Sequence, residues 1–192
     1  MFPFNLNYKK TTPIIVLIIC TVCAYLISEY ANKIQFDIIG LIEVPSFYKV
    51  LFQVSSIFAA IIPLIIYSFL LITSETMLNY VFDESISFEK LAFVFGLAFF
   101  PMMGYYLFFL YNIVTYCENS QIHSIEDFLN IKFIFDLTLN DLKNINLYCW
   151  GCIYFISVAY LLYDKKAAIP VLFSILMPSC FMLIAYYFFF SI

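Results

Sequence analysis

Long apolar stretches fill most of this chain, and several of them contain a proline. About 20 apolar residues cross the roughly 30 Å hydrocarbon core of a bilayer when they form a helix. Lipid offers the backbone no hydrogen-bond partners, so each crossing is expected to be helical. The chain is 65% hydrophobic and 11% charged, whereas about a quarter of the residues in a soluble domain are charged. The sequence therefore predicts a polytopic membrane protein.

Hydropathy places five spans in a single transmembrane domain that covers residues 1–192. The spans are expected at about residues 12–28, 50–73, 88–116, 145–163 and 167–190. The apolar pattern of the second span continues past Thr76 toward Phe82. No small-x-small cleavage pattern follows Ser28, which favours a retained first span over a cleaved signal peptide. The predicted fold is an all-α bundle of five transmembrane helices, with a long, partly interfacial loop between the third and the fourth.

Five spans would put the two termini on opposite sides of the membrane. The chain has no Arg, and its lysines divide five against four between the two sides. Lysines come in pairs at Lys9-Lys10 and Lys165-Lys166, both on the side of the N-terminus. Positive charge next to spans favours the cytoplasmic side, so we expect the N-terminus there. The sequence has no polybasic run for nucleic acid, and we infer no nucleic-acid partner.

The connection at residues 117–144 is long enough to hold structure of its own. Ser124 stands three residues before Asp127, which is the spacing of a helix N-cap with an acidic third residue. Residues 132–142 fit a helical wheel, and part of them also alternates as a strand would, so periodicity does not choose between the two. A short apolar segment with interleaved polar residues is more typical of the membrane interface than of a crossing. Residues 29–45 show the same ambiguity.

Two cysteine pairs raise the possibility of redox chemistry. Cys149 and Cys152 have the C-x-x-C spacing of thiol–disulfide oxidoreductases, and Cys20 and Cys23 repeat it. A redox pair normally starts a helix after a strand, whereas these pairs fall in apolar helical stretches, so we expect them to serve packing. His123 is the only histidine, and it is expected in a solvated loop. We therefore expect no catalytic residue, no metal site, no cofactor and no enzyme activity.

The spans hold few polar residues and no central charge. The polar residues expected inside them are Gln53, Ser55, Ser56, Ser68, Asn112, Ser157, Ser174 and Ser179. Such groups usually hydrogen-bond between helices, and their pattern argues against a coupled transporter. Small and kinking residues should shape the packing instead. The residues singled out for helix packing or kinks are Pro63, Gly96, Pro101, Gly104, Trp150, Pro170 and Pro178.

We expect one of these small-residue faces to pack within the chain. Gly96 and Gly104 lie eight residues apart on the third span, so they fall on one broad helical face. The second span offers a matching small patch at Ala59-Ala60 and Pro63. The face is therefore predicted to contact that span; the alternative is that both glycines face lipid.

Several short stretches resemble the Yip1-domain family of membrane proteins. Residues 87–101, SFEKLAFVFGLAFFP, look like the family's third-helix region, with Gly96 and Pro101 as its glycine–proline pair. Residues 142–162 resemble the fourth helix, with Leu147-Tyr148 and Trp150 at its opening. Residues 164–168, DKKAA, resemble the turn into the last helix. The glycine expected late in the fourth helix is absent, and so is the long N-terminal segment of the eukaryotic trafficking members.

The resemblance implies the short bacterial type of this family, in the cytoplasmic membrane. With no motif for chemistry, the expected function is a non-catalytic partner or accessory subunit of another membrane complex. Within the family, an ABC-type exporter or a secretion machinery is the implied complex. A small-solute or lipid channel or transporter is the alternative, and an intramembrane thiol oxidoreductase is the third hypothesis. The expected partners are the lipid bilayer and other integral membrane proteins, and no small-molecule substrate is inferred.

Overall fold

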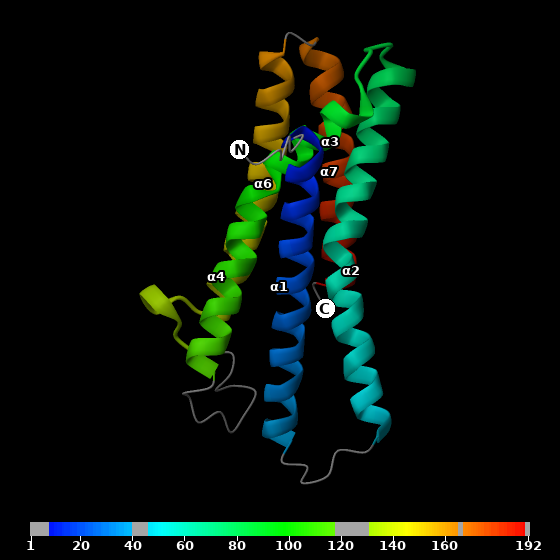
Figure 1. Cartoon of the computed structure of the whole chain (residues 1–192). Coiled ribbons are helices and arrows are strands. Elements are labelled where there is room, and N and C mark those ends of the chain that lie inside the picture. Colours follow the sequence, from blue (N-terminus) through cyan, green and yellow to red (C-terminus); the bar gives the residue numbers. More distant parts are fainter. Residues whose placement is uncertain (1–7, 40–45, 118–130, 165–166, 191–192) are drawn as a thin grey trace, which may run out of the picture. The chain divides into compact units, whose positions relative to one another are not determined.

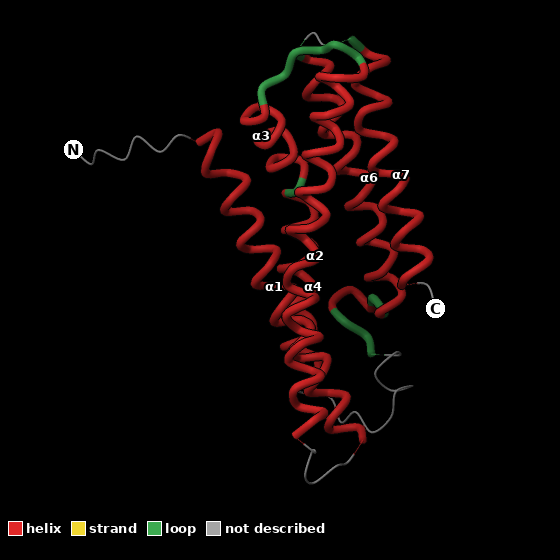
Figure 2. The backbone as a smooth tube through the Cα atoms, turned by 90° about the vertical axis from the view of Figure 1, so that its right-hand side faces the viewer, coloured by secondary structure: helices red, strands yellow, loops and turns green. Residues whose placement is uncertain are grey.

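Helices make up nearly all of the chain that the structure describes. The computed structural model describes residues 8–39, 46–117, 131–164 and 167–190. Figure 2 shows helices joined by loops, with no strand in these ranges, which confirms the all-α prediction for them. The α-helices, labelled in Figure 1, are α1 (Tyr8–Ile39), α2 (Ser46–Thr76), α3 (Phe88–Ala98), α4 (Phe100–Cys117), α6 (Leu139–Tyr163) and α7 (Ala168–Phe190). Two short segments differ: η1 (Met77–Val81) is a π-helix and η2 (Ile134–Asp136) is a 3-10 helix.

Four helical segments are long and apolar enough to cross a membrane. Within the described ranges they are Thr11–Phe36, Phe47–Val81, Phe88–Tyr116 and Leu139–Tyr163. Their number and composition identify an integral membrane protein that crosses the bilayer several times. α7 contributes a shorter apolar stretch, Ala168–Phe181.

Three helices, α1, α2 and α6, extend beyond the expected spans, α1 and α6 by the most at one end. α1 continues past Ser28 to Ile39, although Glu29 and Lys33 lower the hydropathy there. α6 begins at Leu139 rather than near Ile145. Its start is fixed by a reciprocal cap, in which the Thr138 hydroxyl donates to the Asp141 carboxylate at 2.7 Å and accepts from the Asp141 N–H at 3.3 Å.

The third span is interrupted directly before its proline. α3 ends at Ala98, and α4 begins at Phe100, with Pro101 as its second residue. Proline lacks an N–H and is best accommodated in the first turn of a helix, where that donor has no intrahelical partner. Phe99 lies between the two helices, and its N–H donates to the Phe95 carbonyl at 3.0 Å.

The packing divides the chain into two compact units. The helices α1, α2, α4 and α6 contribute to both, whereas α3 and α7 belong to unit 1 alone. Unit 1 comprises Met1–Leu17, Leu64–Pro101 and Trp150–Ile192, and unit 2 comprises Ile18–Pro63 and Met102–Cys149.

Unit 1 is held by buried side chains and by hydroxyl groups that bond to backbone carbonyls. The Tyr67 hydroxyl on α2 donates to the Ala92 carbonyl of α3 at 2.7 Å. Farther along α2, the buried Ser74 hydroxyl donates to the Ser174 carbonyl of α7 at 2.9 Å. The fully buried apolar side chains around these contacts include Leu70, Leu78, Leu91, Val94, Phe95, Leu161, Val171 and Ile175.

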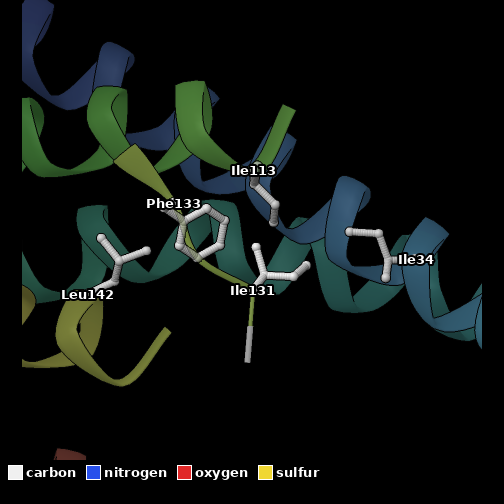
Figure 3. Close-up of a cluster of buried hydrophobic side chains, with 5 residues drawn as sticks. All are labelled: Ile34, Ile113, Ile131, Phe133 and Leu142. Carbon is white, nitrogen blue, oxygen red and sulfur yellow. The ribbon is translucent and has the colours of Figure 1, made fainter. Parts of the chain in front are cut away.

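Unit 2 has its own apolar cluster, which ties a loop to three helices. Figure 3 shows Ile34 of α1, Ile113 of α4 and Leu142 of α6 around Ile131 and Phe133 from the loop. The fully buried Asn112 of α4 accepts a hydrogen bond from the Ile134 N–H at 3.1 Å, which fixes the loop. Residues 131–138 are therefore mostly irregular, with the single turn η2, rather than a continuous helix or a strand. The predicted cap at Ser124 and Asp127 lies outside the described residues.

Candidate functional site

The most site-like feature of unit 2 is a cavity of about 590 Å³ between α1 and α2. Small-molecule sites are typically about 300–1,000 Å³ in volume. We call this cavity the α1–α2 pocket. Its lining residues are Tyr25, Leu26, Glu29, Tyr30, Asn32, Lys33 and Phe36 of α1 and Lys49, Phe52, Gln53 and Ser56 of α2.

The lining residues of each helix recur every three to four positions. On α1 they lie from Tyr25 to Phe36, and on α2 from Lys49 to Ser56. This spacing places them on one face of each helix. In Figure 1 the two helices run in opposite directions, so the later turns of α1 lie beside the first turns of α2. The pocket is therefore formed by two facing helical stripes.

A side-chain amide joins the two helices inside the pocket. The Asn32 amide nitrogen donates to the Phe52 carbonyl at 3.2 Å and to the Ser56 hydroxyl at 3.0 Å. Ser56 is only 2% exposed. A buried hydroxyl needs a hydrogen-bond partner, and Asn32 supplies it. This pair of bonds fixes the register of α1 against α2.

Aromatic rings form much of the remaining wall. The rings of Phe36 and Phe52 meet edge to face, with centroids 4.3 Å apart. Tyr25 and Tyr30 also line the pocket and are half-buried. The pocket thus combines apolar aromatic surface with polar groups, which is the usual character of a small-molecule site.

Three charged side chains lie at the pocket: Glu29, Lys33 and Lys49. All three are exposed, and none forms an ion pair with another described residue. Glu29 and Lys33 are four residues apart on α1, a spacing at which an ion pair can form on a helix. Their charges are therefore available to a bound group that carries both signs.

Two of these charges, Glu29 and Lys33, lie near the end of an apolar segment that is longer than the hydrocarbon core of a bilayer. α1 has 32 residues, so it is about 48 Å long at 1.5 Å per residue, against a hydrocarbon core of about 30 Å. Glu29 and Lys33 both fall within the apolar segment Thr11–Phe36. Ionisable groups within spans usually pair with each other or mark a functional site.

Gly96, which the sequence singled out, forms a close helix contact in unit 1. A Cβ placed on Gly96 would lie 2.8 Å from the Pro13 Cα and 2.9 Å from the Pro13 Cβ. The neighbour of Gly96 is therefore α1 rather than the expected patch on the second span. In contrast, a Cβ on Gly104 would have no described atom within 4 Å, and Gly104 is exposed.

The other packing and kink residues lie at separate places. Pro63 and Pro178 are buried inside the continuous helices α2 and α7. Pro101 and Pro170 lie in the first turns of α4 and α7 and are half-buried. Trp150 meets Phe99 edge to face, with ring centroids 6.4 Å apart. None of these residues lines the α1–α2 pocket.

The described residues show no metal cluster, and the two cysteine pairs lie on α1 and α6. The described ranges contain no group of three or more His, Cys, Asp or Glu side chains that could hold a metal. On α6, Cys149 is buried and Cys152 is exposed, so the two thiols differ in environment although they are three residues apart. On α1, Cys20 and Cys23 are both buried. His123 lies outside the described residues.

Sequence reasoning singled out Gln53 and Ser56 but missed most of the pocket. Glu29, Asn32, Lys33 and Phe36 were assigned to a connection because charges end the apolar run at Ser28. The three-to-four-residue spacing of Tyr25, Glu29, Asn32 and Phe36 was a signal that the helix continues.

Comparison with known proteins finds no relative of this chain. No family model matches the chain, and no similar curated protein or solved structure is found.

Proposed function

We propose that this protein is a non-catalytic partner or accessory subunit of another integral membrane complex. In this proposal five helices cross the membrane, with α7 as the fifth, and the N-terminus lies in the cytoplasm of a bacterial cell. The resemblance to Yip1-domain proteins is part of the proposal, and it points to an ABC-type exporter or a secretion machinery as the complex.

The observation that supports a partner is an exposed apolar face on the first half of α2. Its large side chains recur every three to four residues, so they form one continuous stripe. They are Phe47, Val50, Leu51, Val54, Ile57, Phe58 and Ile61. Phe47 is 70% exposed and Phe58 is 66% exposed. Such a stripe offers rigid aromatic and branched surface for van der Waals packing against a transmembrane helix of another protein.

Site-specific photo-crosslinking in intact cells tests this proposal. A benzophenone amino acid at position 58 should give an adduct with one integral membrane protein that also co-purifies in mild detergent. Replacing Ile57 and Ile61 with Ala should weaken that adduct, because both side chains belong to the same stripe. Ile169 and Ile184 of α7, which are comparably exposed, provide the matched control pair for replacement with Ala.

Two results would count against a partner on this face. One is a crosslink only to lipid or to another copy of this chain. The other is an equal loss of adduct for both isoleucine pairs, which would indicate a general folding defect rather than a specific contact.

A small-solute or lipid channel or transporter is the second candidate, and the α1–α2 pocket favours it. The pocket has the volume of a small-molecule site and carries both charges and aromatic rings. Flux of a bound solute or lipid across reconstituted vesicles, measured with and without the protein, tests this candidate.

A further inference from the structure

We propose that the α1–α2 pocket binds a phosphoethanolamine group, a primary ammonium joined by a short linker to a phosphate. The group can come from the head of a phosphatidylethanolamine lipid or from free phosphoethanolamine. This inference rests on the second candidate function, which it deepens, and it is independent of the accessory role.

The charges of the pocket carry the argument. Lys33 and Lys49 supply two cations for a phosphate, and Glu29 supplies one anion for an ammonium. None of them is neutralised by another described residue. A ligand with only a phosphate would leave the Glu29 carboxylate without an opposite charge in the pocket. A ligand with both signs satisfies all three side chains.

The uncharged polar groups fit the same ligand. Both hydrogen bonds from Asn32 to α2 use its amide nitrogen, so its side-chain carbonyl can accept a hydrogen bond from an ammonium. Gln53 is exposed at the pocket, and its amide hydrogens can donate to a phosphate oxygen. The pocket therefore offers acceptors and donors in addition to charges of both signs.

The aromatic wall gives the ammonium a second kind of contact. Tyr25, Tyr30, Phe36 and Phe52 line the same cavity. A cation near the face of an aromatic ring is attracted by the ring, and the attraction grows when water is excluded. An ammonium held between Glu29 and these rings is thus favoured over a neutral hydroxyl group at the same place.

Direct binding measurements with purified protein in detergent test the proposal. Calorimetric titrations would use short-chain phosphatidylethanolamine, short-chain phosphatidylglycerol, free phosphoethanolamine and inorganic phosphate as separate probes. We expect the ethanolamine lipid to bind about tenfold or more tightly than the glycerol lipid, because a glycerol hydroxyl can donate to Glu29 but brings no positive charge to the carboxylate. Tighter binding of the lipid than of free phosphoethanolamine identifies the lipid as the source, and the reverse order identifies the free molecule.

Charge-matched variants separate the roles of the three side chains. Replacing Lys33 and Lys49 with Gln should weaken binding of both lipids by about tenfold or more. The control replaces Lys132 and Lys143 with Gln; both are exposed lysines of unit 2 outside the pocket, and binding should not change. Glu29→Gln should remove the preference for the ethanolamine lipid while binding of the glycerol lipid is retained.

Several results would overturn the proposal. The first is equal affinity of the wild type for the two lipids. The second is binding of inorganic phosphate as tight as, or tighter than, binding of the ethanolamine lipid. The third is an unchanged lipid affinity in the variant with Gln at positions 33 and 49. Circular dichroism and thermal unfolding of each variant verify its folding. If the double lysine variant does not fold, the lipid preference of Glu29→Gln decides the question alone. Because no partner protein is present in these titrations, their result is independent of the crosslinking experiment.

Discussion

The helix α1 forms two very different contacts, one in each unit. In unit 1 its Pro13 lies directly against Gly96 of α3, and there is no room for a Cβ on the glycine. In unit 2 its later turns meet α2 through Asn32, with a cavity of about 590 Å³ beside this contact. One contact is close and apolar, and the other is polar and open.

The difference shows how residue size and polarity decide what a helix pair can do in a membrane. A glycine lets two backbones approach, and van der Waals contact then stabilises the pair. Long polar and aromatic side chains keep the helices apart and place hydrogen-bonding groups between them. The contact at Gly96 is therefore suited to structure, and the α1–α2 pocket to binding. Four substitutions, ordered by expected effect on stability, can break or sharpen this comparison.

The largest effect is expected for Gly96→Leu. Its Cβ alone would lie 2.8 Å from the Pro13 Cα, so the backbones must separate. Overpacking of this kind costs about 1–3 kcal/mol, and more where backbone is involved. Folded yield in membranes and the unfolding temperature in detergent should both fall. Gly104→Leu is the matched control, since a Cβ there meets no described atom within 4 Å; equal losses in the two variants would refute the close contact.

A smaller loss is expected for Asn32→Ala on the polar side of the comparison. This change removes the bonds to the Phe52 carbonyl and to the buried Ser56 hydroxyl. Losing the partner of a buried polar group costs about 1–3 kcal/mol in water-soluble proteins, and single bonds in membrane proteins average about 0.6 kcal/mol. Chemical unfolding in mixed micelles should place Asn32→Ala between these values. Ser55→Ala, at an exposed position on α2, should leave the free energy of unfolding unchanged. A greater loss of stability for Ser55→Ala than for Asn32→Ala would contradict the role of the Asn32 hydrogen bonds in joining α1 to α2.

Ser74→Ala tests a single interhelical hydrogen bond in unit 1. The Ser74 hydroxyl donates to the Ser174 carbonyl at 2.9 Å, and Ser74 is fully buried. We expect a loss of about 0.6 kcal/mol, the average for such bonds in membranes. Ser68→Ala on the exposed side of α2 serves as the control. If the two serine variants unfold at the same temperature, the bond to α7 contributes nothing measurable.

The smallest effect is expected for Lys90→Gln. Lys90 pairs with Asp164, but both side chains are about one-third exposed. Ion pairs in contact with solvent contribute about 0–1 kcal/mol and weaken with salt. The unfolding temperature should therefore change little, and any change should shrink at high salt. A loss as large as that of Gly96→Leu would show that polar surface contacts, rather than close packing, hold unit 1 together.

Much of the fold follows from hydropathy alone. Hydropathy predicted five spans, all of them helical because lipid permits few alternatives to a helix. In the part of the chain that the structure describes, four of them are helices long and apolar enough to cross a bilayer, and the fifth has a shorter apolar stretch. The boundaries were harder to predict. α1 was ended too early at Ser28, because a hydropathy average treats Glu29 and Lys33 as the end of a helix although helices project beyond the membrane.

The candidate site was only partly predictable for the same reason. Gln53 and Ser56 stood out as polar groups inside an apolar stretch, but their partner Asn32 belonged to the segment assigned to a loop. The neighbour of Gly96 could not be derived either, since a glycine indicates close approach without identifying the approaching helix. For α6, the spacing of Thr138 and Asp141 was a readable start signal that hydropathy did not use.

Thermal unfolding with and without short-chain phosphatidylethanolamine tests the division between a structural contact and a binding pocket most directly. A ligand that binds only the folded state stabilises it by RT ln(1 + L/Kd), where L is the free ligand concentration, so tighter binding at a given ligand concentration gives a larger rise in the unfolding temperature. We predict that Gly96→Ala lowers the unfolding temperature but keeps the rise that the lipid produces. The variant with Gln at positions 33 and 49 should keep the starting temperature and lose the rise. The account is contradicted if the lipid stabilises both variants equally, or if Gly96→Ala removes the lipid response while the lysine variant retains it.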